Sequence, residues 1–242
     1  PLPKQIFGHP WMLFGEDKMS KSKGNVIYAD DLVRHFGVDA VRYYSLHEMP
    51  YAQDGTITYE TFIARYNTEL ANTLGNLVNR TVAMVNKYFD GVLYKDGEKG
   101  DFDDDLIKTA YKAKADMAAA MEDLHVADAM DAVWDLIRRS NKYIDETMPW
   151  ALAKDENGRE RLKAVLYNLV ESIRYIAVML KPFMPETSEK IAQQTNCGSL
   201  TWESLENFGA VADGTKVGTA TPLFARIDEA KKLEELKNEQ SV

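Results

Sequence analysis

The chain has 242 residues, 45% of them hydrophobic, and its formal net charge is −9. This length and apolar content allow one or two domains with a substantial core. No apolar run approaches the ~20 residues that a membrane-spanning helix needs, and the negative charge argues against nucleic-acid binding by bulk electrostatics. A single cysteine, Cys197, excludes an internal disulfide, and the four histidines show no metal-ligand spacing. The simplest interpretation is a cytoplasmic protein without a membrane partner.

The first 55 residues predict a small mixed α/β region. Residues 5–7 and 11–14 have the composition of strands, and a turn at 15–17 follows the second. Acidic residues at 30–31 favour the start of a short helix that Gly37 ends, because carboxylates stabilise a helix N-terminus and glycine suits a helix C-terminus. A second helix is expected over residues 38–48.

From Thr58 onward the spacing of apolar residues predicts helices, with Thr58 as the N-cap of the first and Gly91 as its stop. The expected helices span residues 59–89, 104–124, 126–146, 159–180 and 186–195. Short connections between them indicate an antiparallel bundle. We therefore expect a mainly α fold that divides into the α/β region (1–55), the helical domain (56–209) and a C-terminal tail (210–242) ending in a frayed helix.

The most informative stretch lies between the predicted strands and the first helix: Lys18-Met19-Ser20-Lys21-Ser22-Lys23-Gly24-Asn25. Its ammonium groups and hydroxyls suit the polyphosphate of ATP, because lysine–phosphate contacts are among the stronger polar interactions. A shorter basic string of this kind is usually only a solvated turn. The full eight-residue string resembles the KMSKS signature of class I aminoacyl-tRNA synthetases.

Later motifs narrow the resemblance to the C-terminal half of a bacterial-type methionyl-tRNA synthetase. In chain order they are Phe36-Gly37-Val38-Asp39-Ala40-Val41-Arg42-Tyr43-Tyr44, Asn76-Leu77-Val78-Asn79-Arg80, Phe89-Asp90-Gly91, Pro149-Trp150, Leu180-Lys181-Pro182-Phe183-Met184-Pro185 and Pro222-Leu223-Phe224-Ala225-Arg226-Ile227-Asp228. The resemblance implies a ligase that activates methionine with ATP to methionyl-adenylate and transfers it to tRNA-Met. We call the segment from Lys18 to Asn25 the lysine loop. The isoleucyl, valyl, leucyl and cysteinyl enzymes share this loop and a helical domain, but they do not share this combination of later motifs.

The family's other ATP-binding signature, the HIGH motif, does not occur in this sequence; His9 stands in Gly8-His9-Pro10-Trp11. By resemblance, that motif, the methionine pocket and the zinc-bearing insertion would lie upstream of Pro1. We therefore expect a fragment that cannot activate methionine by itself, and we expect the family's zinc to be bound by residues absent from this chain.

The resemblance assigns the lysine loop to the α-phosphate chemistry of methionine activation. Lys21, the second lysine of the motif, would bind the phosphates most tightly in the transition state, and Lys18 would assist. Ser20, Ser22 and Gly24 would complete the ATP-binding set. Positioning and charge neutralisation carry most of the rate in such a reaction. Magnesium is expected to arrive with the ATP, and no carboxylate of the sequence is identifiable as its ligand.

A second candidate site lies on the helical domain. Asn72, Asn76 and Arg80 are spaced four apart, so on an α-helix they fall within an arc of about 80°. Amides and a guanidinium suit unpaired base edges, and Pro149-Trp150 offers an indole for base stacking. By resemblance, these positions read the CAU anticodon of tRNA-Met, with Asn72 the least secure match. The alternative is that the three polar residues are a solvent face and that the tryptophan packs a corner.

Other functions stay open at this level. A non-catalytic tRNA-binding module would share the helical motifs, and a helical scaffold could carry the lysine loop incidentally. Two basic clusters are further candidates for contact with RNA, although such clusters are more often solvated helix faces: Arg138-Arg139-Lys142 and Arg159-Arg161-Lys163.

Overall fold

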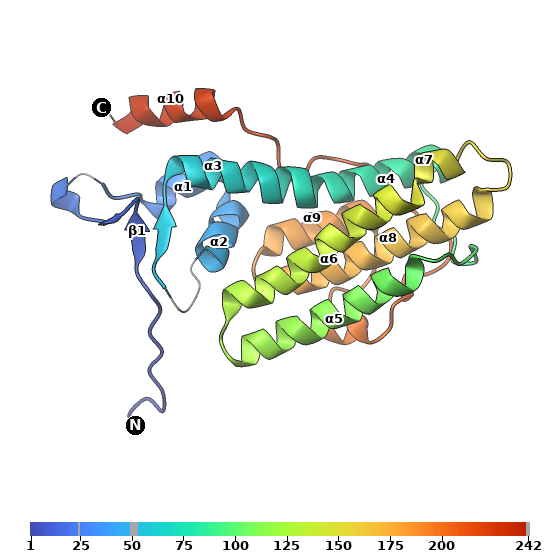
Figure 1. The fold of residues 1–242 in the computed structure, drawn as a ribbon, viewed down its shortest axis with the longest axis horizontal. Coiled ribbons are helices and arrows are strands. Elements are labelled where there is room, and N and C mark those ends of the chain that lie inside the picture. Colours follow the sequence, from blue (N-terminus) through green and yellow to red (C-terminus); the bar gives the residue numbers. More distant parts are fainter. Residues whose placement is uncertain (24, 49–52, 241–242) are drawn as a thin grey trace.

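The computed structural model describes residues 1–23, 25–48 and 53–240. The chain is mainly helical, with a small sheet and two short helices at one end of an elongated helix bundle (Figure 1). In the sheet, β1 (Met12–Phe14) pairs antiparallel with β2 (Asp17–Lys18) and parallel with β3 (Gly55–Ile57). Leu13 lies opposite both Lys18 and Thr56. The lysine loop begins in β2, at Lys18, and β1 joins it to β3, the strand that precedes the first long helix.

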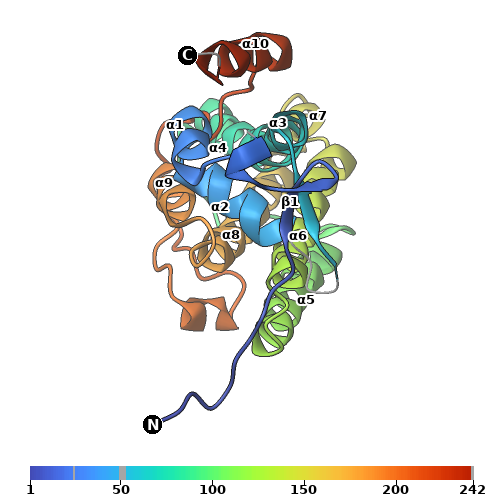
Figure 2. The same ribbon diagram turned by 90° about the vertical axis from the view of Figure 1, so that its left-hand side faces the viewer.

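The predicted strand over residues 5–7 is wrong. These residues form no strand and belong to an extended arm that leads away from the sheet (Figure 2). A strand needs a partner for its backbone groups, and within the described chain both edges of β1 are already occupied, by β2 and β3. Ile6 is 87% exposed, so the apolar character of this segment does not reflect burial here.

Two short helices follow the lysine loop, as predicted. They are α1 (Ala29–Phe36) and α2 (Val38–His47). Gly37 joins them with φ 85°, a backbone conformation that glycine adopts without strain. Leu32 and Phe36 bury the inner face of α1, and the expected mixed α/β region is confirmed.

The first long helix runs from Tyr59 to Phe89 but is not α-helical throughout. It consists of α3 (Tyr59–Arg65), a π-helical segment (Tyr66–Gly75) and α4 (Asn76–Phe89). Thr58 forms the expected N-terminal cap, reciprocally with Thr61. Asp90 and Gly91, both with positive φ, end the helix.

The π-helical segment corrects the prediction of a regular α-helix. Its wider turn is accompanied by side-chain hydrogen bonds to backbone carbonyls: the Thr73 hydroxyl donates to Thr68 O (2.7 Å), and the Asn141 amide donates to Thr73 O (3.1 Å). Leu70 and Leu74 are buried in the π-helical segment. Their spacing of four residues also suits an α-helix, so apolar spacing could not reveal the difference.

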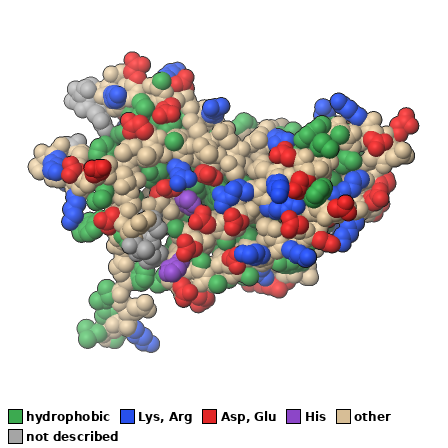
Figure 3. Space-filling model, viewed as in Figure 1, with side chains coloured by type: hydrophobic (Ala, Val, Ile, Leu, Met, Phe, Trp, Pro, Cys, Tyr) green, Lys and Arg blue, Asp and Glu red, His purple; other side chains and the backbone are tan. Residues whose placement is uncertain are grey.

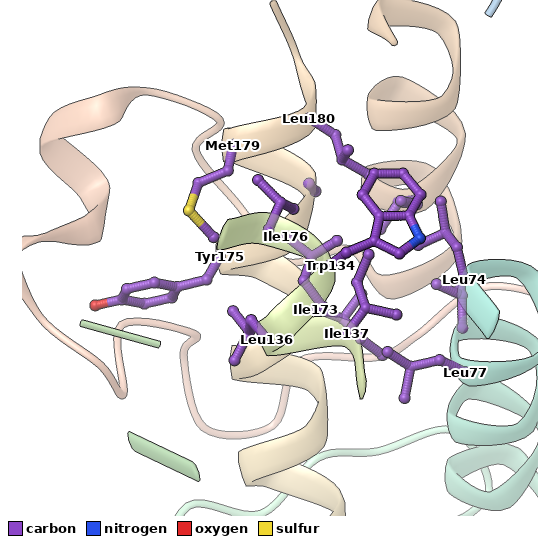
Figure 4. Packing of buried hydrophobic residues seen from close by; sticks show 14 of the residues in the cluster. Leu74, Leu77, Trp134, Leu136, Ile137, Ile173, Tyr175, Ile176, Met179 and Leu180 are labelled. Atoms are coloured by element: carbon purple, nitrogen blue, oxygen red, sulfur yellow. The ribbon is translucent and has the colours of Figure 1, made fainter. Parts of the chain in front are cut away.

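The remaining helices complete an antiparallel bundle around one core (Figure 1). They are α5 (Asp103–Glu122), α6 (Val126–Thr147), the short α7 (Pro149–Leu152), α8 (Arg159–Leu180) and α9 (Pro185–Thr195). Trp134 of α6 lies among side chains of α8 and of the long helix, including Ile173, Leu180 and Leu74 (Figure 4). This burial of large apolar side chains is the main stabilising term of the bundle.

Two of the sequence motifs meet where α2 packs against the end of the bundle. The Asp39 carboxylate accepts a hydrogen bond from the backbone N–H of Thr187 at 2.6 Å, and so caps α9. Arg42 donates to the carbonyl oxygens of Phe183 (2.6 Å) and Pro182 (2.8 Å). The α/β region is therefore joined to the bundle by specific polar contacts.

The C-terminal segment returns along the bundle to the α/β end. A 3₁₀ turn (Trp202–Glu206) comes first. Farther on, the Asn67 side chain accepts from Ile227 N (2.8 Å) and donates to Ile227 O (2.9 Å). The final helix, α10 (Glu229–Gln240), then lies beside α1 and α3 (Figures 1 and 2). The expected helix in the tail is confirmed.

Candidate functional site

The lysine loop is closed by an asparagine that the sequence interpretation did not include among the site residues. The Asn25 side chain accepts from Ser20 N (2.8 Å) and donates to Lys18 O (3.2 Å), so it bridges the two arms of the loop. Between them, Lys21–Lys23 forms a single 3₁₀ turn. An asparagine directly after the loop glycine is the signal that could have identified it, because its side chain readily bonds nearby backbone.

The three lysines of the loop have different environments. The Lys18 ammonium lies 4.9 Å from the centre of the exposed Trp11 ring, and Lys23 pairs with Asp17 at 3.4 Å. Lys21 is exposed and makes no hydrogen bond or ion pair to any residue that the structure describes. Of the three lysines, only Lys23 pairs with a carboxylate among the described residues, and Lys21 is the one that contacts no described partner at all.

The hydroxyls of Ser20 and Ser22 lie 2.8 Å apart and hydrogen-bond to each other. This brings together two of the residues expected to contact ATP, on the same turn as Lys21. Gly24, also expected in the ATP-binding set, lies outside the described residues.

At the other candidate site the structure brings Arg80 and Trp150 together, although 70 residues separate them in sequence. The Arg80 guanidinium carbon lies 5.9 Å from the centre of the indole ring, within the range of a cation–π contact. Trp150 is 40% exposed, whereas Pro149 is buried at the first position of α7. Asp145 of α6 lies near the same guanidinium, at 3.9 Å.

Asn72 and Asn76 are exposed on the same helix as Arg80, and their side chains make no hydrogen bonds to other described residues. Asn72 lies in the π-helical segment and Asn76 at the start of α4. A step of four residues is slightly more than one turn of an α-helix but less than one turn of a π-helix. The three side chains therefore still share one face, within a narrower arc than the sequence predicts.

The two candidate sites lie at opposite ends of the molecule's long axis (Figure 1). The β1–β2 end carries the lysine loop, and α7 stands at the far end of the bundle. Neither site can contact the other directly. A single ligand that contacts both sites must therefore span the length of the molecule. Otherwise each site binds a different ligand.

The basic clusters noted in the sequence are largely paired with carboxylates. Arg139 contacts Asp105 and Glu146, and Arg161 contacts Asp103. On the face shown in Figure 3, basic and acidic side chains are interspersed rather than separated. These clusters therefore offer less uncompensated charge than their sequence suggests.

Two protein families match successive parts of this chain. The family described as "tRNA synthetases class I (M)" matches residues 1–82, which include the lysine loop. The family described as "Anticodon binding domain of methionyl tRNA ligase" matches residues 93–240, more than half of the chain. The chain belongs to the methionyl-tRNA synthetase family. It covers the end of the catalytic domain and the anticodon-binding domain.

Individual relatives agree with this membership. The methionine–tRNA ligase of Clostridium acetobutylicum is 52% identical over 98% of this chain, and that of Bacillus subtilis is 46% identical over 98%. Among solved structures, Mycobacterium tuberculosis methionyl-tRNA synthetase in complex with methionyl-adenylate superposes on 93% of the chain with a TM-score of 0.87 and 33% identity. The match covers 45% of that structure's chain, and 37% and 36% of the two ligases.

The lysine loop lies among the residues that the synthetase family matches, and Pro149 and Trp150 lie among those that the anticodon-binding family matches, whereas Asn72 and Asn76 lie in the synthetase match. Arg80 falls within the first match, close to its end. Within the described ranges, no helix is long and apolar enough to cross a bilayer.

Proposed function

We propose that this chain is the part of a methionine–tRNA ligase that holds the phosphates of ATP and reads the CAU anticodon of tRNA-Met. The complete ligase would act in the cytoplasm, activating methionine with ATP and transferring it to the tRNA. We divide the chain into three parts: residues 1–55 belong to the end of the catalytic domain, residues 56–209 form the anticodon-binding domain, and residues 210–242 form the C-terminal tail.

At the catalytic end, Lys21 is the proposed catalytic residue. When the methionine carboxylate attacks the α-phosphate, the P–O bond to pyrophosphate breaks and negative charge grows on the leaving group. Because Lys21 pairs with no carboxylate among the described residues, its ammonium is available to stabilise that charge. Lys18, Ser20 and Ser22 would bind and orient the phosphates, with Gly24 completing the loop, and Asn25 would keep the arms of the loop together.

Magnesium would enter this site bound to ATP rather than to a protein cage. The only group of potential ligands close enough to hold a cation within the described chain is His35, Glu235 and Glu239, and none of these belongs to the lysine loop. Asp17, a carboxylate of the adjoining strand, is paired with Lys23. Mg²⁺ commonly keeps substrate phosphates and water as ligands, which fits this donor set.

At the bundle end, the exposed indole of Trp150 would stack on an anticodon base, with Pro149 fixing its position. Asn72 and Asn76 would donate and accept hydrogen bonds at base edges, and Arg80 would donate them. Stacking contributes ~1–3 kcal/mol per base, and hydrogen bonds to base edges add the discrimination between bases. Phosphate contacts elsewhere would position the tRNA without reading its sequence.

The observation that carries this proposal is the contact between Arg80 and the exposed ring of Trp150. Asn72 and Asn76, on the same helix as Arg80, are exposed and make no side-chain hydrogen bond to another described residue. The test is binding of the chain to tRNA-Met at low salt, compared with the same tRNA carrying an altered anticodon. We expect at least a tenfold preference for CAU. Equal affinity for both tRNAs would reject anticodon reading, and no binding to either would favour a structural scaffold.

The chain by itself should not catalyse ATP–pyrophosphate exchange, because its sequence contains no HIGH motif to bind adenine and ribose. ATP–pyrophosphate exchange by the purified chain would contradict the proposal that the residues binding adenine and ribose are not among these 242 residues. A purely tRNA-binding function is the second candidate, and full-length ligase activity that is insensitive to the lysine loop would favour it.

A further inference from the structure

His47 at the end of α2 lies between two carboxylates from different parts of the fold. Its Nδ1 is 2.9 Å from Glu48 Oε1, and its Nε2 is 3.1 Å from Asp131 Oδ1. Glu48 directly follows α2, whereas Asp131 belongs to α6. The side chain is 14% exposed, and its ring stacks on Tyr43 with the ring centres 5.1 Å apart.

This arrangement requires a charged histidine. A neutral imidazole carries one N–H, so it can donate to only one of the two carboxylates and would leave its other lone pair facing a negative oxygen. The imidazolium donates to both. Burial of the ring works against the charge, but the hydrogen bonds to Glu48 and Asp131 outweigh it, and the pKa of His47 is raised.

Other charged groups surround this pair of contacts. Arg65 of α3 binds Glu48 (Nε to Oε1, 3.0 Å) and approaches Glu69 of the π-helical segment (Nη1 to Oε1, 3.9 Å). The Tyr43 hydroxyl is buried without a hydrogen-bond partner in the described chain, and burial raises the pKa of this phenol, so it stays neutral. The carboxylates in contact with the imidazole are thus Glu48 and Asp131, and the Arg65 guanidinium binds only the first, so the charge around the ring is net negative and favours the cation.

The position of His47 connects the two proposed sites. Through α1 and α2 it belongs to the region that follows the lysine loop. Asp131 stands near the start of α6, a helix of 22 residues, or roughly 33 Å. The other end of α6 leads directly into Pro149 and Trp150. A contact that fixes the start of this rigid helix therefore constrains where Trp150 lies relative to the lysine loop.

We propose that His47 is a positioning residue that, as an imidazolium, holds α6 against α2 and so sets the geometry between the anticodon end and the catalytic end. Its effect on tRNA charging rests on the proposed function. Its charge state and its contact with Asp131 do not.

The charge state is tested by NMR titration of the histidine side chains in this chain. We expect the His47 imidazole to titrate above its ordinary value of about 6.5, and the variant Asp131→Asn to lower its pKa. His125→Gln is the matched control, because His125 is exposed and pairs with Asp128 within its own helical turn. A His47 pKa at or below about 6.5 would overturn the proposal, whatever the chain binds.

Melting curves test the contact itself. The pKa of His47 is higher in the folded state than in the unfolded state. Its contribution to stability is therefore complete at pH values below the unfolded pKa, and it is lost as the pH rises through the folded pKa. His47→Gln should therefore lower Tm by roughly 3 °C near pH 6 and by less than about 1 °C near pH 9. His125→Gln should show no such trend. An equal loss at both pH values would mean a packing role and would reject the imidazolium clamp.

The consequence for charging is tested in the full-length ligase. His47→Gln should reduce kcat/KM for tRNA-Met roughly fivefold near pH 6.5 and leave ATP–pyrophosphate exchange without tRNA nearly unchanged. The difference from wild type should shrink as the pH rises. Wild-type charging at pH 6.5 by this variant would refute the positioning role. If the chain instead showed no tRNA recognition at all, the titration would still test the clamp, so the two failures are distinguishable.

Discussion

The Asp39 carboxylate on α2 caps helix α9 by accepting a hydrogen bond from the backbone N–H of Thr187, 2.6 Å away. Asp39 is 5% exposed, so water cannot replace this bond. The contact joins two segments 148 residues apart and fixes how the α/β region sits on the bundle. Arg42, on the next turn of α2, reinforces it through the carbonyls of Phe183 and Pro182.

Asp39→Ala should lower the free energy of unfolding by about 2 kcal/mol, because it removes a buried helix cap and leaves an N–H without a partner. Urea denaturation measures the loss. Asp39→Asn keeps an acceptor oxygen of similar shape and should cost less. Asp30→Ala, at an exposed position in the first turn of α1, is the control. Equal effects at positions 30 and 39 would contradict the capping role.

Lys21→Ala in the full-length ligase should slow methionyl-adenylate formation by about 10²-fold or more and leave methionine binding nearly unchanged. The reason is that a contact formed mainly in the transition state changes rate more than ground-state affinity. ATP–pyrophosphate exchange is the measurement.

Lys23→Ala is the matched control for Lys21, since both lysines stand on one 3₁₀ turn but Lys23 is paired with Asp17. Its loss should change the exchange rate by less than about tenfold. Exchange by Lys21→Ala within about threefold of wild type would reject the catalytic assignment.

Trp150→Ala should weaken binding of tRNA with a CAU anticodon by roughly 5- to 150-fold, the equivalent of ~1–3 kcal/mol of stacking. Binding of tRNA with an altered anticodon should change much less. Arg80→Ala should act in the same direction, and the double variant should be non-additive, because the two side chains touch.

Trp202 and Lys114 provide a matched control pair for Trp150 and Arg80. Trp202 is 36% exposed, and the Lys114 ammonium also lies 5.9 Å from its ring centre. Trp202→Ala should leave anticodon preference unchanged. If Trp150→Ala instead lowers Tm strongly and harms binding of all tRNAs alike, the indole is a packing residue and its recognition role is wrong.

A buried ion pair at the start of α5 should make stability fall in acid. The Asp103 carboxylate accepts hydrogen bonds from Arg161 (2.5 and 2.8 Å), the Tyr143 hydroxyl (2.6 Å) and Gly100 N (3.1 Å). Burial favours the neutral acid, but these hydrogen bonds outweigh it and lower the pKa of Asp103. The stabilisation is therefore complete above the unfolded value of about 3.9 and is lost as the pH falls through the lower folded value.

Asp103→Asn should cost about 3 kcal/mol at pH 7, because it leaves Arg161 facing a neutral group, and the cost should shrink below pH ~4. Asp104→Asn is the control, since this neighbouring carboxylate is exposed and pairs with Lys99 at the surface. Chemical denaturation across pH measures both variants. A constant cost from pH 7 to pH 3 would contradict the titration of Asp103.

Local sequence was sufficient for the elements whose cause is local. Thr58 and Gly91 mark the ends of the long helix because capping and positive φ are properties of single residues. The lysine loop could be recognised because its site residues are contiguous. The apolar spacing predicted the bundle, because each amphipathic helix must bury one face.

Tertiary packing decided the rest. The strand expected at 5–7 lacks a partner among the described residues, and the π-helical segment of residues 66–75 depends partly on Asn141 of another helix. The contact between Arg80 and Trp150 joins helices that only the packed core brings together. Spacing along one helix can place side chains on a common face, but the partner across that face is set by long-range burial, which no local pattern encodes.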